Sequence, residues 1–265
     1  MWISLTTDYG RLDGFVAACH GAIAKIAPEA RVIDVTHEVP PGDVVRGAAV
    51  LAQTVVDLPT GVHVAVVDPG VGTARRSVAL RTPGGHLVGP DNGLLLWAAD
   101  ALGGVTEAVE LRNPAWLAPA VSRTFHGRDV FAPVAARLAL GRPVADAGPA
   151  LDPAGLVRLP DPLVAAGDGW LEAEVLTVDR FGNVQLAAPG AALAGFAVPE
   201  VLVSGAPATV GETFADALPG GLVVLVDSAG RVAVAANGGR ADEELSVGPG
   251  DVLRITVVGS ADTST

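Results

Sequence analysis

A carboxylate and two guanidinium groups lie close together in the segment Asp68-Pro-Gly-Val-Gly-Thr-Ala-Arg75-Arg76. The glycines allow the backbone to turn tightly, so that Arg75 or Arg76 can return toward Asp68. The carboxylate of such a pair can orient a water molecule, and the guanidinium can stabilise negative charge that develops on it. The alternative is a structural ion pair that closes a loop. A phosphate site is not indicated, because G-x-G-x-x-G needs a glycine where Arg75 stands.

His126 is the second candidate for chemistry, in the segment Thr124-Phe-His126-Gly-Arg128-Asp129. A histidine next to glycine, just ahead of a helix, is placed to face a cleft, and its ordinary pKa of about 6.5 suits proton transfer. The alternative is a histidine that bonds to a neighbouring helix terminus. No metal site is predicted, because the remaining histidines are scattered and form neither an H-E-x-x-H motif nor a pair with cysteine, at positions His20, His37, His63 and His86.

Two further segments carry residue types that bind nucleosides. Thr6-Thr7-Asp8-Tyr9-Gly10 ends the first predicted strand, where a carboxylate can accept hydrogen bonds from a ribose diol or can cap a turn. In Asp179-Arg-Phe181-Gly-Asn183, the amide of Asn183 can pair with an adenine edge and the Phe181 ring can stack on it. The alternative for this segment is a polar β-turn with Asn183 in a left-handed conformation.

The first half of the chain alternates apolar β-branched runs with amphipathic stretches, which predicts an α/β domain with a mainly parallel sheet covered on both faces. The predicted strands are Trp2 to Thr6, Arg31 to Val35, His63 to Val67 and Ser77 to Leu80. The predicted helices are Asp13 to Ile26, Asp43 to Val56, Asn92 to Leu102 and Asp129 to Leu140. Thr7, Asp8, His37, Glu38 and Asp68 follow these strands at the carboxyl edge, where such sheets bind ligands.

The second half is predicted to be a small all-β domain, a barrel or sandwich of short antiparallel strands. Prolines make residues 146–168 irregular, so the predicted organisation is an α/β domain over 1–145, a linker over 146–168 and a barrel-like domain over 169–265. The predicted strands are Trp170 to Val178, Val184 to Leu186, Val201 to Val203, Leu222 to Val226, Val232 to Ala236 and Val252 to Val258.

Composition narrows the classes of partner. The formal net charge of −12 leaves no basic stripe for a nucleic-acid backbone, so no nucleic acid is expected. Mean hydropathy is +0.45, but the longest uncharged stretch, Phe181 to Pro199, is interrupted by glycines, prolines and amides, so no membrane span is expected. The N-terminal residues carry neither a basic leader nor a long apolar stretch, so export is not predicted, and the single cysteine, Cys19, is expected to be buried and inert; both features favour the cytoplasm.

Seven segments in the same order resemble one family, the S-adenosyl-L-methionine (SAM) hydroxide adenosyltransferases, which are adenosine-forming SAM hydrolases related to fluorinase and chlorinase. The resemblance covers nearly the whole chain. The segments are ISLTTDYGRLDGFVAACHGAI, VIDVTHEVPPGDV, VVDPGVGTARRSVAL, GPDNGLL, TFHGRDVFAP, VDRFGNVQL and DSAGRVAVAANGG.

This resemblance implies an α/β domain followed by a barrel, assembled as a homotrimer with SAM bound between subunits. It implies that Asp68, Arg75 and His126 handle the attacking water, with Arg76 as the competing arginine. Asp8 would contact the ribose and Asp179 the methionine amino group. Contacts to adenine or to the methionine carboxylate carry over to Asn183, Ser228 and Asn237. No cofactor is expected, since SAM is the substrate.

Three alternatives stay open at this stage. A chlorinase-like halogenase is disfavoured because the halogenating relatives carry a tyrosine where Asp68 stands, and a carboxylate repels chloride; Gly127 matches the chlorinase and does not decide. A SAM-binding protein without turnover would share the same affinity for SAM. A methyltransferase is disfavoured because TTDYG follows the first strand in place of a glycine-rich loop.

Overall fold

The computed structural model describes residues 1–196 and 199–258 and divides the chain into two compact units, Met1–Leu159 and Pro160–Thr265. The boundary falls inside residues 146–168, the segment predicted to be a linker. In the structure, β7 (Ala150–Leu151) of this segment joins the sheet of the first unit, and β8 (Val164–Gly167) joins the sheet of the second.

The first unit is an α/β domain whose sheet has the strand order β2-β1-β3-β5-β4-β6-β7. β1 is parallel to β2 and β3, and β3 is parallel to β5, whereas β4 is antiparallel to both β5 and β6. The strands other than β7 are β1 (Trp2–Thr7), β2 (Arg31–Thr36), β3 (Gly61–Val66), β4 (Ser77–Thr82), β5 (Gly85–Pro90) and β6 (Glu107–Glu110). The helices are α1 (Phe15–Ile26), α2 (Val44–Thr54), α3 (Leu96–Ala101) and α4 (Ala132–Ala139).

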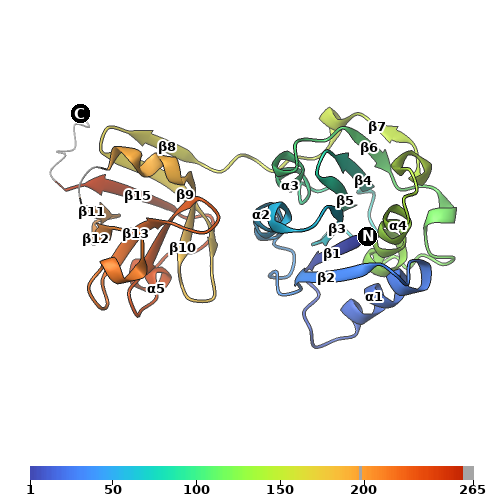
Figure 1. Ribbon diagram of the computed structural model, residues 1–265, viewed down its shortest axis with the longest axis horizontal. Helices are drawn as coiled ribbons and strands as arrows, with labels where there is room; N and C mark the ends of the chain where they lie inside the picture. Colours follow the sequence, from blue (N-terminus) through green and yellow to red (C-terminus); the bar gives the residue numbers. More distant parts are fainter. Residues whose placement is uncertain (197–198, 259–265) are drawn as a thin grey trace. The chain divides into compact units, whose positions relative to one another are not determined.

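Helices cover both faces of this sheet, as the apolar runs of β1 and β3 require (Figure 1). α1 and α4 pack on one face over a core that includes Ile3, Leu5, Ile23 and Val134. α2 and α3 pack on the other face, over a core that includes Leu51, Val67, Leu80 and Ala98. The predicted fold class is confirmed.

Several predicted boundaries differ from the structure for local reasons. β5 and β6 were not predicted, because β5 contains glycine and proline and β6 has only four residues. The helix predicted from Asn92 begins at Leu96, since the Asn92 side chain accepts a hydrogen bond from the Leu94 amide and Gly93 has a φ of +95°. A π-helical turn, Gly127–Phe131, precedes α4.

The second unit is a closed β-barrel. Its sheet has the order β10-β14-β13-β12-β11-β15-β9-β8, and the additional pairing of β10 with β9 closes the ring and leaves β8 attached to β9. The strand β12 was not predicted, and its pairing with β13 is parallel, whereas all strands of this unit were predicted to be antiparallel. The remaining elements are β9 (Trp170–Val178), β10 (Val184–Pro189), β11 (Glu200–Val203), β12 (Ala206–Val210), β13 (Leu222–Val226), β14 (Arg231–Ala236), β15 (Val252–Val257) and α5 (Ala241–Leu245).

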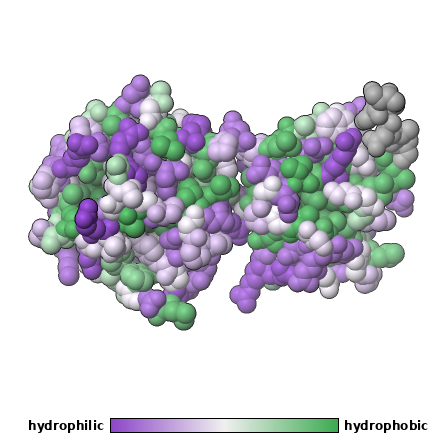
Figure 2. All heavy atoms as spheres, turned by 180° about the vertical axis from the view of Figure 1, so that it is seen from behind, coloured by the Kyte–Doolittle hydropathy of each residue, from purple (hydrophilic) through white to green (hydrophobic). Residues whose placement is uncertain are grey.

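The surface of each unit mixes polar and apolar side chains. On the face shown in Figure 2, hydrophilic and hydrophobic residues are interspersed. Within residues 1–196 and 199–258, none of the helices has the length and apolar character that a membrane crossing demands.

Candidate active site

Two carboxylates leave the first sheet at the same edge. Thr7, the last residue of β1, pairs with Val66, the last residue of β3, in a parallel register. Asp8 and Asp68 follow these strands by one and two residues. Asn92 fixes the end of β3, because its side-chain amide donates to the Val67 carbonyl at 2.9 Å. The carboxyl edge of the parallel strands therefore presents both acids, as the sequence predicted.

The loop after Asp68 folds back through two tight turns. The Val71 amide donates to the Asp68 carbonyl at 3.2 Å, and the Thr73 amide donates to the Gly70 carbonyl at 3.2 Å. Gly72, between them, has a φ of +76°, a region that glycine adopts without strain. The turns bring Arg75 back to the acid that begins the loop, as the glycines predict.

Arg75 and Asp68 form a forked ion pair. Arg75 Nε donates to both carboxylate oxygens, at 2.9 and 3.0 Å, and Nη2 also bonds to Oδ2. The two side chains are 11% and 5% exposed, so solvent screens this pair little. Arg75 Nη1 donates to the Ser77 hydroxyl at 2.6 Å, and the guanidinium lies 5.4 Å from the centre of the Phe131 ring. The guanidinium is held from several sides.

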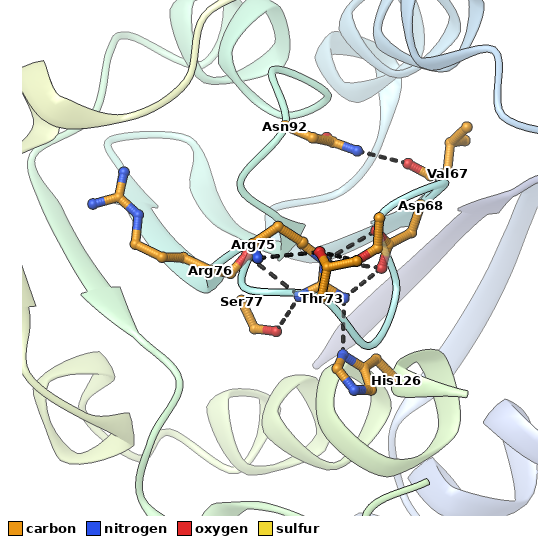
Figure 3. Close-up of polar contacts among 9 residues, drawn as sticks. Val67, Asp68, Thr73, Arg75, Arg76, Ser77, Asn92 and His126 are labelled. Carbon is orange, nitrogen blue, oxygen red and sulfur yellow. Dashed lines mark hydrogen bonds and ion pairs between the residues drawn. The ribbon is translucent and has the colours of Figure 1, made fainter. Parts of the chain in front are cut away.

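Arg76 points away from this cluster and serves another contact (Figure 3). Its Nε donates to Asp91 at 2.8 Å and its Nη2 donates to the Gly155 carbonyl at 2.6 Å. The other oxygen of Asp91 accepts from the Val157 amide at 2.9 Å. Arg76 therefore ties residues 155–157 to the end of β5, and Arg75 is the arginine beside Asp68.

His126 completes the cluster from a distant part of the chain. Arg75 Nη2 lies 2.8 Å from His126 Nδ1, and because a guanidinium can only donate, Nδ1 accepts and the imidazole is neutral with its proton on Nε2. Burial lowers the pKa of His126, and the positive charge of Arg75 lowers it further. Within the described part of the chain, Nε2 has no hydrogen-bond partner.

Asp129 fixes the segment that carries His126. Its carboxylate accepts from the Ser122 amide at 2.9 Å and forms a two-pronged pair with Arg128. Gly127 lies directly against the hydroxyl end of Tyr9, where a Cβ atom would overlap it. The His126 segment and the segment after β1 therefore touch.

Asp8 is held by a backbone amide from the segment after β2. The Gly42 amide donates to Asp8 Oδ2 at 2.9 Å. Burial raises the pKa of Asp8, and the negative charge of Asp68 also raises it, while the Gly42 hydrogen bond opposes both. Asp8 therefore belongs to the same electrostatic environment as the Asp68, Arg75 and His126 cluster.

In the barrel unit, Asp179 and Asn183 form one turn. Asp179 Oδ1 accepts from the Phe181 and Asn183 amides at 2.8 and 2.9 Å, and Oδ2 accepts from the Asn183 side chain at 2.7 Å. Gly182, with a φ of +84°, takes the left-handed position that the turn alternative had assigned to Asn183. The Phe181 ring is 73% exposed. The polar groups of this turn therefore bond within the turn, and the Phe181 side chain faces solvent.

The other two predicted contacts of the barrel lie apart from each other. Asn237 follows β14, and its side chain donates to the Ala217 carbonyl at 2.7 Å. Ser228 is exposed in the turn that precedes β14. Because a strand rises about 3.3 Å per residue, these turns are on the order of 20 Å apart. The register of β10 with β14 places Asn183 at the Asn237 end, so the structure groups Asp179, Asn183 and Asn237 and leaves Ser228 at the other end.

Three contributors were missed by the sequence. Ser77 and Phe131 contact Arg75, and the Gly42 amide holds Asp8. Ser77 is the first residue of β4 and follows Arg75 by two positions, which is only a weak sign of their contact. The Gly42 contact is made by a backbone amide, so the residue type gives no sign of it. Among the residues described, no group of three or more histidine, cysteine or acidic side chains is arranged to hold a metal ion.

The fold and the charged cluster match the class of two-domain enzymes in which an α/β unit, here the one with Asp68, Arg75 and His126, is followed in the chain by a β-barrel. The chain belongs to the SAM hydroxide adenosyltransferase family, whose N-terminal domain matches residues 3–148 and whose C-terminal domain matches residues 173–254. This confirms the family that seven sequence segments indicated.

Individual relatives agree with this membership. The (R)-S-adenosyl-L-methionine hydrolase of Salinispora arenicola is 70% identical over 256 residues, which cover 96% of this chain and 97% of that protein. The fluorinase of an Actinoplanes species is 31% identical over 209 residues, 69% of this chain and 70% of that protein. A crystal structure of an uncharacterized conserved protein from Thermotoga maritima superposes with a TM-score of 0.89 at 36% identity, covering 96% of this chain and 100% of that one.

Proposed function

We propose that this protein hydrolyses SAM to adenosine and L-methionine by in-line attack of water at the ribose C5′ carbon. The contacts of Arg75 with both Asp68 and His126 carry the proposal, because a carboxylate, a guanidinium and a neutral imidazole together can orient and deprotonate one water molecule. Relatives at 70% and 42% identity named (R)-S-adenosyl-L-methionine hydrolase support it.

The reaction needs little covalent help from the protein. The water oxygen forms a bond to C5′ while the C5′–S bond breaks, and the bond electrons pass to the sulfonium sulfur, which becomes the neutral thioether of methionine. The water loses one proton, so the positive charge of the sulfonium leaves as a hydrated proton. A site that removes water from the nucleophile and aligns it behind C5′ lowers the barrier to this step.

Each residue of the cluster has a distinct part. Asp68 accepts a hydrogen bond from the attacking water and sets its direction. Arg75 holds Asp68 and stabilises hydroxide character as it develops. His126 relays the proton: it can accept one at Nδ1, the nitrogen that faces Arg75 Nη2, and release the proton carried on Nε2. Burial and Arg75 lower its pKa, which favours the neutral form that this relay needs.

Asp68 also favours hydrolysis over halogenation. A carboxylate at the nucleophile position repels a halide ion and attracts water. The negative charge further complements the cationic sulfonium of the substrate. A chlorinase-like activity would need this charge to be absent, and the structure holds Asp68 in a tight ion pair at the site.

The remaining substrate contacts extend the proposal. Asp8 binds the ribose hydroxyls, Asp179 the methionine amino group, and Asn183 and Asn237 the adenine or the carboxylate. Ser228 belongs to the same set by resemblance only. We further propose a cytoplasmic homotrimer with SAM bound between subunits, which would let Ser228 act at a different site from Asn237. No cofactor is required, since the leaving group is already activated as a sulfonium.

The test is a time course of purified protein with SAM, analysed by chromatography. Adenosine and methionine should appear together, and Asp68→Asn and His126→Ala should each remove most turnover. SAM that is bound in stoichiometric amount but stays intact would indicate a binding protein instead. A halo-deoxyadenosine peak in parallel reactions with chloride or fluoride would indicate a halogenase.

A further inference from the structure

The segment after β2 lies against the segment after β1 and holds it through several hydrogen bonds. The Gly10 amide donates to the His37 carbonyl at 2.7 Å, and the Val39 amide donates to the Thr7 carbonyl at 3.3 Å. The Gly42 amide donates to the Asp8 carboxylate at 2.9 Å. The orientation of Asp8 therefore depends on where residues 37–42 lie.

The His37 side chain joins these two segments in the interior. It is 1% exposed, and its Nδ1 lies 2.8 Å from the hydroxyl of Thr7, which is 3% exposed. Its Nε2 lies 3.1 Å from Asp34 Oδ1 on β2. His37 therefore bonds through Nδ1 to the last residue of β1, while its Nε2 lies at ion-pair distance from Asp34 without the geometry of a hydrogen bond.

Asp34 also contacts a second histidine. His20 Nε2 also lies 2.8 Å from Asp34 Oδ1. Burial opposes ionisation of Asp34, but the His20 and His37 rings beside it lower its pKa. The Thr7 hydroxyl, which bonds to His37 Nδ1, also accepts from the Tyr9 amide at 3.2 Å.

We propose that His37 is a positioning residue for Asp8: through Thr7 and residues 37–42, it holds the ribose-binding carboxylate in the orientation that grips the 2′ and 3′ hydroxyls. This inference rests on the proposed function. His37 does not touch substrate, and its effect on binding passes through the Asp8 carboxylate alone. A purely structural role would weaken every ligand, whereas this role weakens only ligands that carry the diol.

The experiment compares adenosine with 2′,3′-dideoxyadenosine, which lacks the diol, by calorimetric titration of the full chain. His37→Leu should weaken adenosine binding by about tenfold, the effect of one misdirected charged hydrogen-bond acceptor, and change dideoxyadenosine binding by less than about twofold. KM for SAM should rise by the same factor with kcat nearly constant, because the ribose contact is made in both ground and transition states.

Matched variants separate positioning from folding. His37→Asn keeps a polar group near the Nδ1 position and should restore most of the preference for adenosine. His20→Asn, which alters the same Asp34 contact but lies away from Thr7, should leave the preference unchanged. If His37→Leu does not fold, the nearly isosteric Thr7→Val is used in its place. It should also weaken adenosine binding and leave dideoxyadenosine binding nearly unchanged.

Two results would overturn the inference in different ways. Equal weakening of both nucleosides, or an unchanged adenosine preference in His37→Leu, removes the role of His37 while SAM hydrolysis by the wild type stands. A wild type that shows no preference for adenosine and no hydrolysis removes the proposed function, and the role of His37 with it.

Discussion

The polar clusters of the two units are built in opposite ways. In the α/β unit, Asp68 and Arg75 come from one loop and His126 from a segment 51 residues after Arg75, and they are linked through side-chain bonds to Arg75. In the barrel unit, Asp179 and Asn183 come from one turn and bond mainly to its own backbone. The first arrangement gathers two opposite charges and an imidazole from distant parts of the chain. The second fixes the shape of a loop and leaves Phe181 exposed.

Arg75 should show the largest effect if the first cluster performs the chemistry. Arg75→Ala removes the ion-pair partner of Asp68 and the hydrogen-bond donor to His126 Nδ1, and should lower kcat by about 1,000-fold or more. Steady-state release of adenosine measures this.

Arg76→Ala is the matched control for Arg75. Arg76 holds Asp91 and the Gly155 carbonyl, so its loss should lower the free energy of unfolding by about 2 kcal/mol and leave kcat within about threefold of the wild type. A large loss of kcat in Arg76→Ala with full activity in Arg75→Ala would reverse the assignment of the two arginines.

Acid stability should separate the units, because all five histidines lie in residues 1–159. Burial lowers the pKa of His63 from 6.5 to about 4, so the unfolded chain binds a proton at higher pH than the folded one. The free energy of unfolding is therefore at its full value above pH 6.5 and decreases as pH falls toward 4. The free energy of unfolding of the first unit should fall by about 3 kcal/mol over this range.

Urea unfolding in a Trp170→Phe background measures this loss, since the remaining tryptophans, Trp2, Trp97 and Trp116, lie in the first unit. His63→Asn should flatten the dependence on pH. An identical slope in His63→Asn would contradict the assignment of the loss to His63.

The pH dependence of turnover should follow His126. Its pKa is lowered by burial and by Arg75, so the neutral form persists below the ordinary value of about 6.5. We expect kcat/KM to be flat through neutral pH and to fall about tenfold per pH unit only on the acid side of 6.5. A profile that falls already above pH 7 would contradict a neutral, proton-accepting His126.

Phe181 should show the smallest effect and tests the binding role of the barrel unit. Phe181→Ala removes a ring that is 73% exposed, so the free energy of unfolding should change by less than about 0.5 kcal/mol. The affinity for SAM should fall several-fold through the loss of stacking on adenine. Unchanged affinity in a calorimetric titration would leave this turn as structure only.

The parts of the fold that were predictable from sequence have a clear pattern of apolar residues. β1 and β3 follow the predicted segments closely because mostly apolar runs end in polar residues, and β9 does so because Glu172 and Glu174 alternate with apolar residues. β5 and β6 escaped prediction because glycine, proline and shortness hide the pattern. The parallel pairing of β12 with β13 depends on how the barrel closes, which no local pattern records.

The site was predictable where chemistry and spacing coincide. The glycine turn places an arginine on Asp68, but the choice between Arg75 and Arg76 depends on Asp91, which arrives from the end of β5. The contact between Arg75 and His126 joins residues 51 positions apart, so only the folded chain reveals it. The hydrogen bond from Gly42 to Asp8 is donated by a backbone amide, so the sequence of residue types does not indicate it.

Turnover of SAM in water enriched in oxygen-18, followed by mass spectrometry of both products, tests the central claim most directly. Attack at C5′ by a water molecule that the Asp68, Arg75 and His126 cluster holds predicts one heavy oxygen in the 5′-hydroxyl of adenosine and none in methionine. Intact SAM after prolonged incubation, or adenosine without the label, would contradict it.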